Sequence, residues 1–163
     1  MTTIETPDEN MSRQQEHDDL SAQAKEQVFK TAYGNVKQFV EDRNFIAANV
    51  LAFAILEDRL QAAWTAARMV RLNSAKPTRR EVNRNRFADT VRDLLTWGVI
   101  DTEMAQALHS NAHERNRLTH EMIWRLNSFT RKAAETSVRL SRKIDTHQRK
   151  FIASYRPREH LTK

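Results

Sequence analysis

Apolar side chains recur along this chain at helical intervals, in four stretches separated by short polar connections. In residues 21–42 they follow the three- and four-residue spacing of one face of an amphipathic helix; they include Val28, Phe29, Val36, Phe39 and Val40. Residues 44–72 are apolar on nearly every side as far as Leu56, and a helix of that kind is usually the central, buried one. The pattern therefore predicts an amphipathic helix followed by a buried one.

A third helix is expected at about residues 78–97, because both of its ends carry recognisable signals. Pro77 breaks the preceding linker. Thr78, with Glu81 three positions later, matches a capping box, in which both side chains bind free backbone amides at a helix start. Gly98 stands where a left-handed C-terminal cap belongs.

The last helical stretch begins after Asp101, whose carboxylate can cap a helix that starts at Thr102. No glycine or proline lies between Val99 and Arg156, so the pattern allows one long helix, or two with a break near residues 118–121. The whole chain has only 2 glycines and 3 prolines, too few for many turns or strands. Since short connections place successive helices antiparallel, we expect an all-α, antiparallel bundle of four to five helices.

Charge is unevenly distributed between the start of the chain and the rest. Residues 1–20 hold six acidic residues and one arginine, a net charge of −5, whereas the whole chain of 163 residues carries +6. This segment also lacks apolar periodicity, so we expect a disordered acidic leader, which is either simply solvated or covers a basic surface. Residues 21–155 suffice for one helical domain, and residues 156–163 follow as a basic tail.

The composition excludes several kinds of site and location. Without cysteine, the chain has no disulfide framework, no thiolate metal site and no cysteine nucleophile. Its most apolar run, residues 45–56, is shorter than the ~20 residues that a membrane helix needs. Its acidic start does not resemble a signal peptide. We therefore expect a cytoplasmic protein without a membrane segment.

Residues 104–126 combine apolar and charged positions in an unusual way. On a helix of about 100° per residue, Arg115 falls in the middle of an apolar stripe made by Leu108, Ala112, Leu118, Met122 and Leu126. A buried guanidinium keeps its charge and needs a partner, and Glu57 or Asp58 of the buried helix could supply one. His120 lies about 140° from Arg115. The two can share a site only if the helix breaks between them or two copies face each other.

A polar stripe on the same helix consists of His109, His113, Asn116 and His120. Two histidines four positions apart are a potential metal pair. One helix face rarely closes a metal coordination sphere, however, and the chain has no H-E-x-x-H motif. A polar dimer face or an RNA-contacting stripe is the better interpretation, so we expect neither a metal nor a cofactor.

The hexapeptide R-N-R-L-T-H at residues 115–120 resembles the signature of the HEPN superfamily of small helical proteins: an arginine, a polar residue, three further residues and a histidine. The preceding chain is also similar, with W-G-V-I-D at residues 97–101, then a short helix, the motif and a long final helix. L-E-D-R-L at residues 56–60 fits the earlier helix. The resemblance covers residues 44–150.

This resemblance implies a HEPN-like fold and a metal-independent endoribonuclease of toxin or defence type, often a homodimer with its site at the interface. Arg115 and His120 would be catalytic, and Asn116 would orient or bind. The RNA 2′-OH would be the nucleophile, with His120 moving protons and Arg115 holding the phosphate. An antitoxin or regulatory protein is a further expected partner. Met122 stands where toxins neutralised by tyrosine modification carry a tyrosine, so that mode is not implied.

Basic residues cluster on both sides of this motif, and arginine favours contact with phosphate. Residues 68–92 hold eight basic residues against two acids, and residues 139–163 hold the same numbers. Nucleic-acid contacts are expected from Arg79, Arg80, Arg84, Arg86 and Arg117. Two alternatives remain: a solvated helix surface, or a noncatalytic helical module that binds nucleic acid or a partner protein as a regulator.

Overall fold

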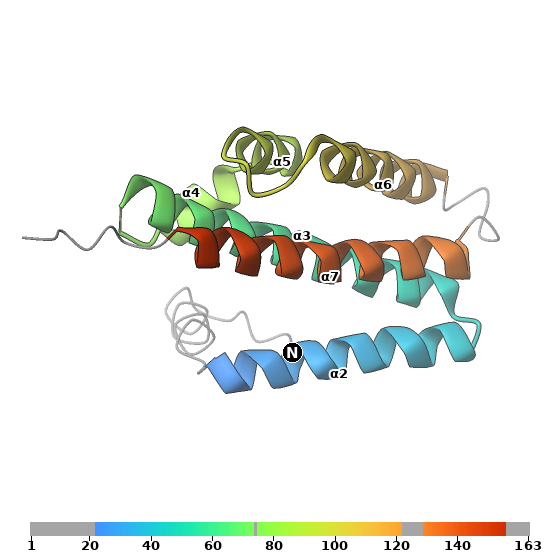
Figure 1. The fold of residues 1–163 in the computed structure, drawn as a ribbon. Helices are drawn as coiled ribbons and strands as arrows, with labels where there is room; N and C mark the ends of the chain where they lie inside the picture. Colours follow the sequence, from blue (N-terminus) through green and yellow to red (C-terminus); the bar gives the residue numbers. More distant parts are fainter. Residues whose placement is uncertain (1–21, 74, 122–128, 156–163) are drawn as a thin grey trace, which may run out of the picture.

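Six helices make up the part of the chain that the computed structural model describes, which is residues 22–73, 75–121 and 129–155 (Figure 1). They are α2 (Ala22–Glu41), α3 (Phe45–Leu72), α4 (Arg79–Arg84), α5 (Phe87–Thr96), α6 (Thr102–Glu121) and α7 (Arg131–Ser154). The same residues contain no strand, which confirms the all-α prediction. None of these helices is long and apolar enough to cross a membrane. The leader at residues 1–20 and the basic tail at residues 156–163 lie outside the described residues.

α3 and α7 form the middle layer of the bundle, with α2 on one side and α5 and α6 on the other (Figure 1). α2 runs antiparallel to α3, and α6 runs antiparallel to α7, as short connections predict. The central pair is instead parallel. Asn49 of α3 donates from Nδ2 to the carbonyl of Thr130 at 3.0 Å, and further along Arg59 pairs with Asp145 at 3.6 Å. The pair is parallel because the chain passes through α4, α5 and α6 before it returns as α7.

α3 is the central helix, as its apolar composition predicts. One core lies between α3, α5, α6 and α7 and includes Leu56, Leu60, Leu94, Leu108 and Ile144. A second core lies between α2, α3 and α7 and includes Val36, Val40, Ala48, Ala52, Ile55 and Ala134. Because α3 contributes to both cores, its burial sets the positions of the layers on either side.

The predicted helix-end signals from Thr78 to Asp101 are confirmed. Thr78 Oγ1 accepts a hydrogen bond from the amide of Glu81 at 3.3 Å, and the Glu81 carboxylate accepts one from the amide of Thr78 at 2.8 Å. Gly98 has φ +73°, the left-handed conformation that glycine adopts without strain. Asp101 accepts a bond from the amide of Met104 at 2.8 Å. Local sequence is therefore sufficient to set these ends.

The helix predicted at residues 78–97 is two helices, α4 and α5, with a break that no glycine or proline marks. Asn85 and Arg86 have extended backbone, and no side chain caps α5 at Arg86. The break allows Phe87 to stack on Phe53 of α3, with 5.9 Å between ring centroids. Packing against α3 therefore overrides the local preference for a continuous helix.

Beyond Thr102 the chain forms two helices, α6 and α7, and not the one long helix that the pattern also allows. α6 continues through residues 118–121, so the break does not fall there. Thr130 caps α7, and its hydroxyl accepts a hydrogen bond from the amide of Ala133 at 3.2 Å. With both breaks counted, the described residues form six helices instead of four to five. Met122 and Leu126, expected on the apolar stripe, lie outside the described residues.

Leu56→Ala tests the central position of α3. Leu56 is fully buried in the first core, so its truncation should leave a cavity and lower the free energy of unfolding by about 2–5 kcal/mol. Val50→Ala is the matched control on the same helix, because Val50 is 62% exposed. The control should change the free energy by no more than about 0.5 kcal/mol. Urea unfolding followed by circular dichroism measures both, and equal losses would contradict the central position of α3.

Candidate functional site

Arg115 lies on the surface of α6, next to the ring of Phe53. Its guanidinium carbon is 4.6 Å from the centroid of that ring, and its Nη1 donates to Oδ1 of Asn116 at 3.1 Å. Leu108 and Leu118 on the same stripe are buried. The prediction that Arg115 is buried is therefore wrong, since its side chain is exposed. A long arginine side chain can cover apolar surface with its stem while its charged end stays in water.

A pocket of about 280 Å³ lies beside Arg115, between α3, α6 and the start of α7. Its lining includes Phe53, Phe129, Asn49, Asn111 and Glu57. Although Glu57 and Arg115 share the pocket, no ion pair joins Arg115 to Glu57 or Asp58 within the described part of the chain. The internal ion pair that the sequence allowed is therefore not formed among these residues, and the exposed guanidinium lies against Phe53 and Asn116 instead.

His120 is exposed near the end of α6, and the helix continues unbroken from Arg115 to this residue. The hydroxyl of Thr119 donates to the carbonyl of Arg115 at 2.9 Å, a bond within the helical turn. On such a helix the side chains of Arg115 and His120 project about 140° apart. One copy of the chain does not bring the two together, so a shared site requires a second copy.

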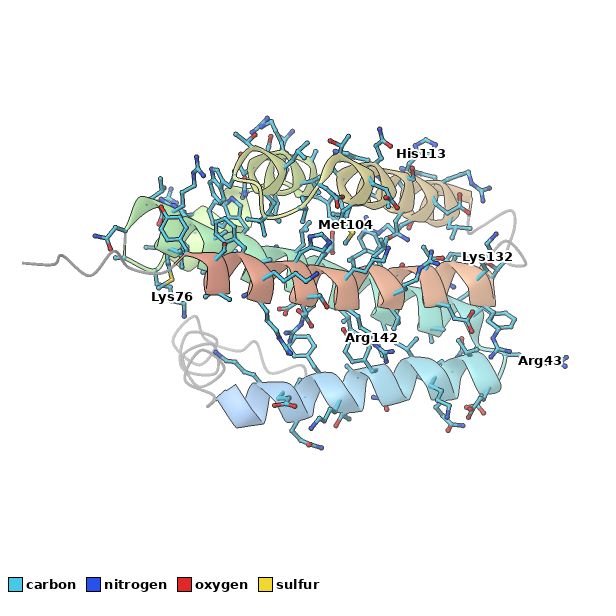
Figure 2. The ribbon with its side chains drawn as sticks, in the orientation of Figure 1. Arg43, Lys76, Met104, His113, Lys132 and Arg142 are labelled. Carbon is cyan, nitrogen blue, oxygen red and sulfur yellow. The ribbon has the colours of Figure 1, made fainter. Side chains whose placement is uncertain are left out.

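The predicted polar stripe of His109, His113, Asn116 and His120 is exposed along its whole length. Figure 2 shows His113 on the side of α6 that faces away from the other helices. In the described part of the chain, no three histidine, aspartate or glutamate side chains are grouped as a metal ion would need. The stripe is therefore accessible to solvent or to a second macromolecule.

Arg117, a predicted nucleic-acid contact, is bound to Glu114 on the same helix. Its Nε and Nη2 donate to the two carboxylate oxygens at 3.0 and 2.7 Å, a bidentate pair. The hydrogen bonds from Arg117 lower the pKa of Glu114, because they favour the charged carboxylate. Much of the charge of Arg117 is thus offset within α6, which makes it a weaker ligand for phosphate than the sequence suggests.

The other predicted nucleic-acid contacts surround α4, at the opposite end of the bundle from residues 115–121 (Figure 1). Arg79, Arg80 and Arg84 belong to α4 itself and Arg86 directly precedes α5; the side chains of Arg80 and Arg86 are exposed. The fold therefore does not bring these arginines and the hexapeptide together in one copy. An RNA that contacted both regions would have to run along the length of the bundle.

A groove between α2 and α7 was not predicted, because it joins residues that are far apart in the chain. Its volume is about 550 Å³, and Arg139, Arg142 and Lys143 of α7 contribute to its lining. The sequence identified these three only as members of a basic cluster. Their i, i+3, i+4 spacing places them on one helix face, but nothing local in the sequence shows that α2 packs beside that face.

No protein-family model matches the chain, and no curated protein or solved structure matches it either.

Glu114→Gln tests the pairing of Arg117 with Glu114. Because the folded-state pKa of Glu114 is lowered, the pair stabilises the fold above the unfolded-state pKa. This contribution is lost as the pH falls through the lowered, folded-state pKa. The substitution should reduce the free energy of unfolding at neutral pH by less than about 1 kcal/mol, since the pair is partly exposed.

Urea unfolding at neutral and strongly acidic pH measures this effect, and the difference between wild type and Glu114→Gln should vanish in acid. Glu57→Gln is the control, because Glu57 has no ion-pair partner among the residues described. A loss that is the same at both pH values would contradict a role for the charge of Glu114.

Proposed function

We propose that this protein is a metal-independent endoribonuclease that acts as a homodimer, with each site formed by Arg115 of one copy and His120 of the other. The geometry of α6 carries the proposal: Arg115, Asn116 and His120 are exposed, and the unbroken helix directs the arginine and the histidine apart. A two-fold axis beside α6 would bring each arginine to the partner's His120. The resemblance of residues 115–120 to the HEPN superfamily supports the same pairing.

In the proposed reaction, RNA supplies its own nucleophile. The 2′-oxygen attacks the adjacent phosphorus, and the bond from phosphorus to the 5′-oxygen of the next nucleotide breaks. His120 accepts the proton of the 2′-hydroxyl, and the leaving 5′-oxygen takes a proton from water. An imidazole suits this role because it titrates near neutral pH. The products are a 2′,3′-cyclic phosphate and a free 5′-hydroxyl.

Arg115 would offset the negative charge that develops on the pentacoordinate phosphorus. Its guanidinium is exposed and has no carboxylate partner in the described part of the chain, so its donors are available to phosphate oxygens. The ring of Phe53 and the side-chain oxygen of Asn116 orient the guanidinium. Asn116 would therefore act as a positioning residue, through its hydrogen bond to Arg115.

The second proposal is a noncatalytic helical module that binds nucleic acid or a regulatory partner protein. The distribution of basic side chains favours it. Arg80 and Arg86 are exposed near α4, and Arg139 and Arg142 are exposed beside α2, while residues 115–121 lie at the far end of α6. In this case the arginines would hold phosphates by displacing counterions, and α6 would perform no reaction.

Cleavage of total RNA in the presence of EDTA tests the first proposal. The wild type should cut RNA to fragments that end in cyclic phosphate. Arg115→Ala and His120→Ala should each lose at least about 100-fold in rate, with RNA binding largely retained. His109→Ala is the matched control, because it removes another exposed histidine of the same stripe and should leave the rate unchanged.

Undiminished cleavage by His120→Ala would show that the chemistry occurs elsewhere. If the wild type binds RNA without cutting it, and Arg80→Glu with Arg86→Glu weakens that binding, the noncatalytic module would be the better account. A toxin role predicts growth arrest when the wild type is expressed and normal growth with His120→Ala. Rescue of the arrest would then provide the assay for an antitoxin.

A further inference from the structure

The groove between α2 and α7 combines an apolar floor with a charged rim. Val36 and Val40 of α2 and Val138 of α7 contribute the apolar part of its lining. Figure 2 shows Arg142 extending from α7 into the space between the two helices. Its guanidinium carbon is 5.1 Å from the centroid of the Tyr33 ring, and the Tyr33 hydroxyl is 2.9 Å from Oγ of Ser141. The contact with Tyr33 holds the guanidinium of Arg142, a positive charge, in the groove.

The positive charge in the groove is offset at one end and not at the other. At the end near the start of α7, Arg131 donates to Glu135 at 2.7 Å and Lys37 lies 3.7 Å from Glu41. Further along α7 lie three exposed basic residues that have no ion-pair partner within the described residues: Arg139, Arg142 and Lys143. This half of the groove therefore presents uncompensated positive charge, which favours an anionic occupant.

The uncompensated half lies toward the N-terminal end of α2. The two helices are antiparallel (Figure 1), and the contact between Tyr33 and Ser141 sets their register. With a rise of about 1.5 Å per residue in both helices, Ala22 at the start of α2 lies level with the C-terminal end of α7. Any chain that precedes Ala22 therefore begins on the side of the groove toward which the uncompensated basic residues lie.

The segment that precedes Ala22 has the complementary charge. Residues 1–20 carry six acids and one arginine, and they also include the apolar side chains of Ile4, Met11 and Leu20. The distance along the helix axis from the level of Ala22 to Arg139 is roughly 20 Å at the helical rise. About six extended residues can span this distance. A tethered segment of this length is also present at an effective concentration in the millimolar range, so even weak ionic contacts would populate a docked state.

We propose that the acidic segment at residues 1–20 docks in cis in the groove between α2 and α7, with its carboxylates on Arg139, Arg142 and Lys143. The apolar floor would accept the apolar side chains of the segment. A docked segment would cover three basic residues that RNA could otherwise use, so it would compete with RNA for this face. The inference does not depend on cleavage by α6, because neither Arg115 nor His120 takes part.

A spin label on the chain of 163 residues tests this docking. The protein has no cysteine, so Ser12→Cys provides a unique attachment site that changes no charge. At low salt the nitroxide should broaden the amide NMR signals of residues 138–146, which lie along the groove. Signals of residues 109–116 in α6, on the other side of α7, should be unaffected. The broadening should disappear when the salt is raised from about 0.02 M to about 0.5 M, because the attraction is ionic.

Charge reversal identifies the docking site. Arg139→Glu, Arg142→Glu and Lys143→Glu together should abolish the broadening in the labelled chain. The matched control is Arg71→Glu, Arg80→Glu and Arg86→Glu, which makes the same change of charge at exposed positions away from the groove and should leave the broadening intact. Thermal unfolding of both variants verifies that the bundle still folds.

Three results would overturn the inference. Signals along the groove that are no broader than those of α6 would show that the segment does not dock there. An equal loss of broadening in the two triple variants would show that the attraction is nonspecific and not directed to the groove. An RNA oligonucleotide that binds the groove equally well in the wild type and in a chain with Glu16→Gln, Asp18→Asn and Asp19→Asn would assign the groove to RNA alone.

Discussion

Burial of α3 on two sides is the constraint on which the rest of the bundle depends. Its apolar side chains form one core with α5, α6 and α7 and a second core with α2 and α7. Arg59 lies where these layers meet. Its guanidinium carbon is 3.1 Å from the centroid of the Phe29 ring and it pairs with Asp145 at 3.6 Å, while its Nε is buried without a hydrogen-bond partner among the described residues. A helix that is buried on two sides fixes which faces its neighbours turn outward.

The exposed chemistry follows from that arrangement. α6 turns Met104, Ala105, Leu108 and Leu118 toward the core, so the histidines and Asn116 on its other face point to solvent. Arg115 stays at the edge of the buried stripe, where Phe53 of α3 supports its guanidinium. Because no break separates Arg115 from His120, the same packing that exposes both residues also keeps them apart in one copy. For this reason, the proposed catalytic site requires two copies of the chain.

Sequence alone predicted the features that short-range interactions control. The capping box at Thr78, the left-handed Gly98 and the cap at Asp101 each involve neighbours within a few residues, and all three are present. The break at Asn85 was missed because its cause, the stacking of Phe87 on Phe53, joins separate helices. Arg115 was placed in the core because an angular pattern cannot distinguish the centre of a buried stripe from its edge. The groove was missed for a similar reason, since it depends on α2 packing beside α7.

Mixing two inactive variants tests the composite site most directly. Arg115→Ala and His120→Ala subunits, combined in equal amounts and allowed to exchange, would form mixed dimers in which one site has both catalytic residues and the other has neither. We expect RNA cleavage to return to roughly a quarter of the wild-type rate, since half of the dimers would each carry one intact site of two. A mixture that stays as inactive as its components, while sedimentation and exchange measurements show that mixed dimers form, would contradict the composite site.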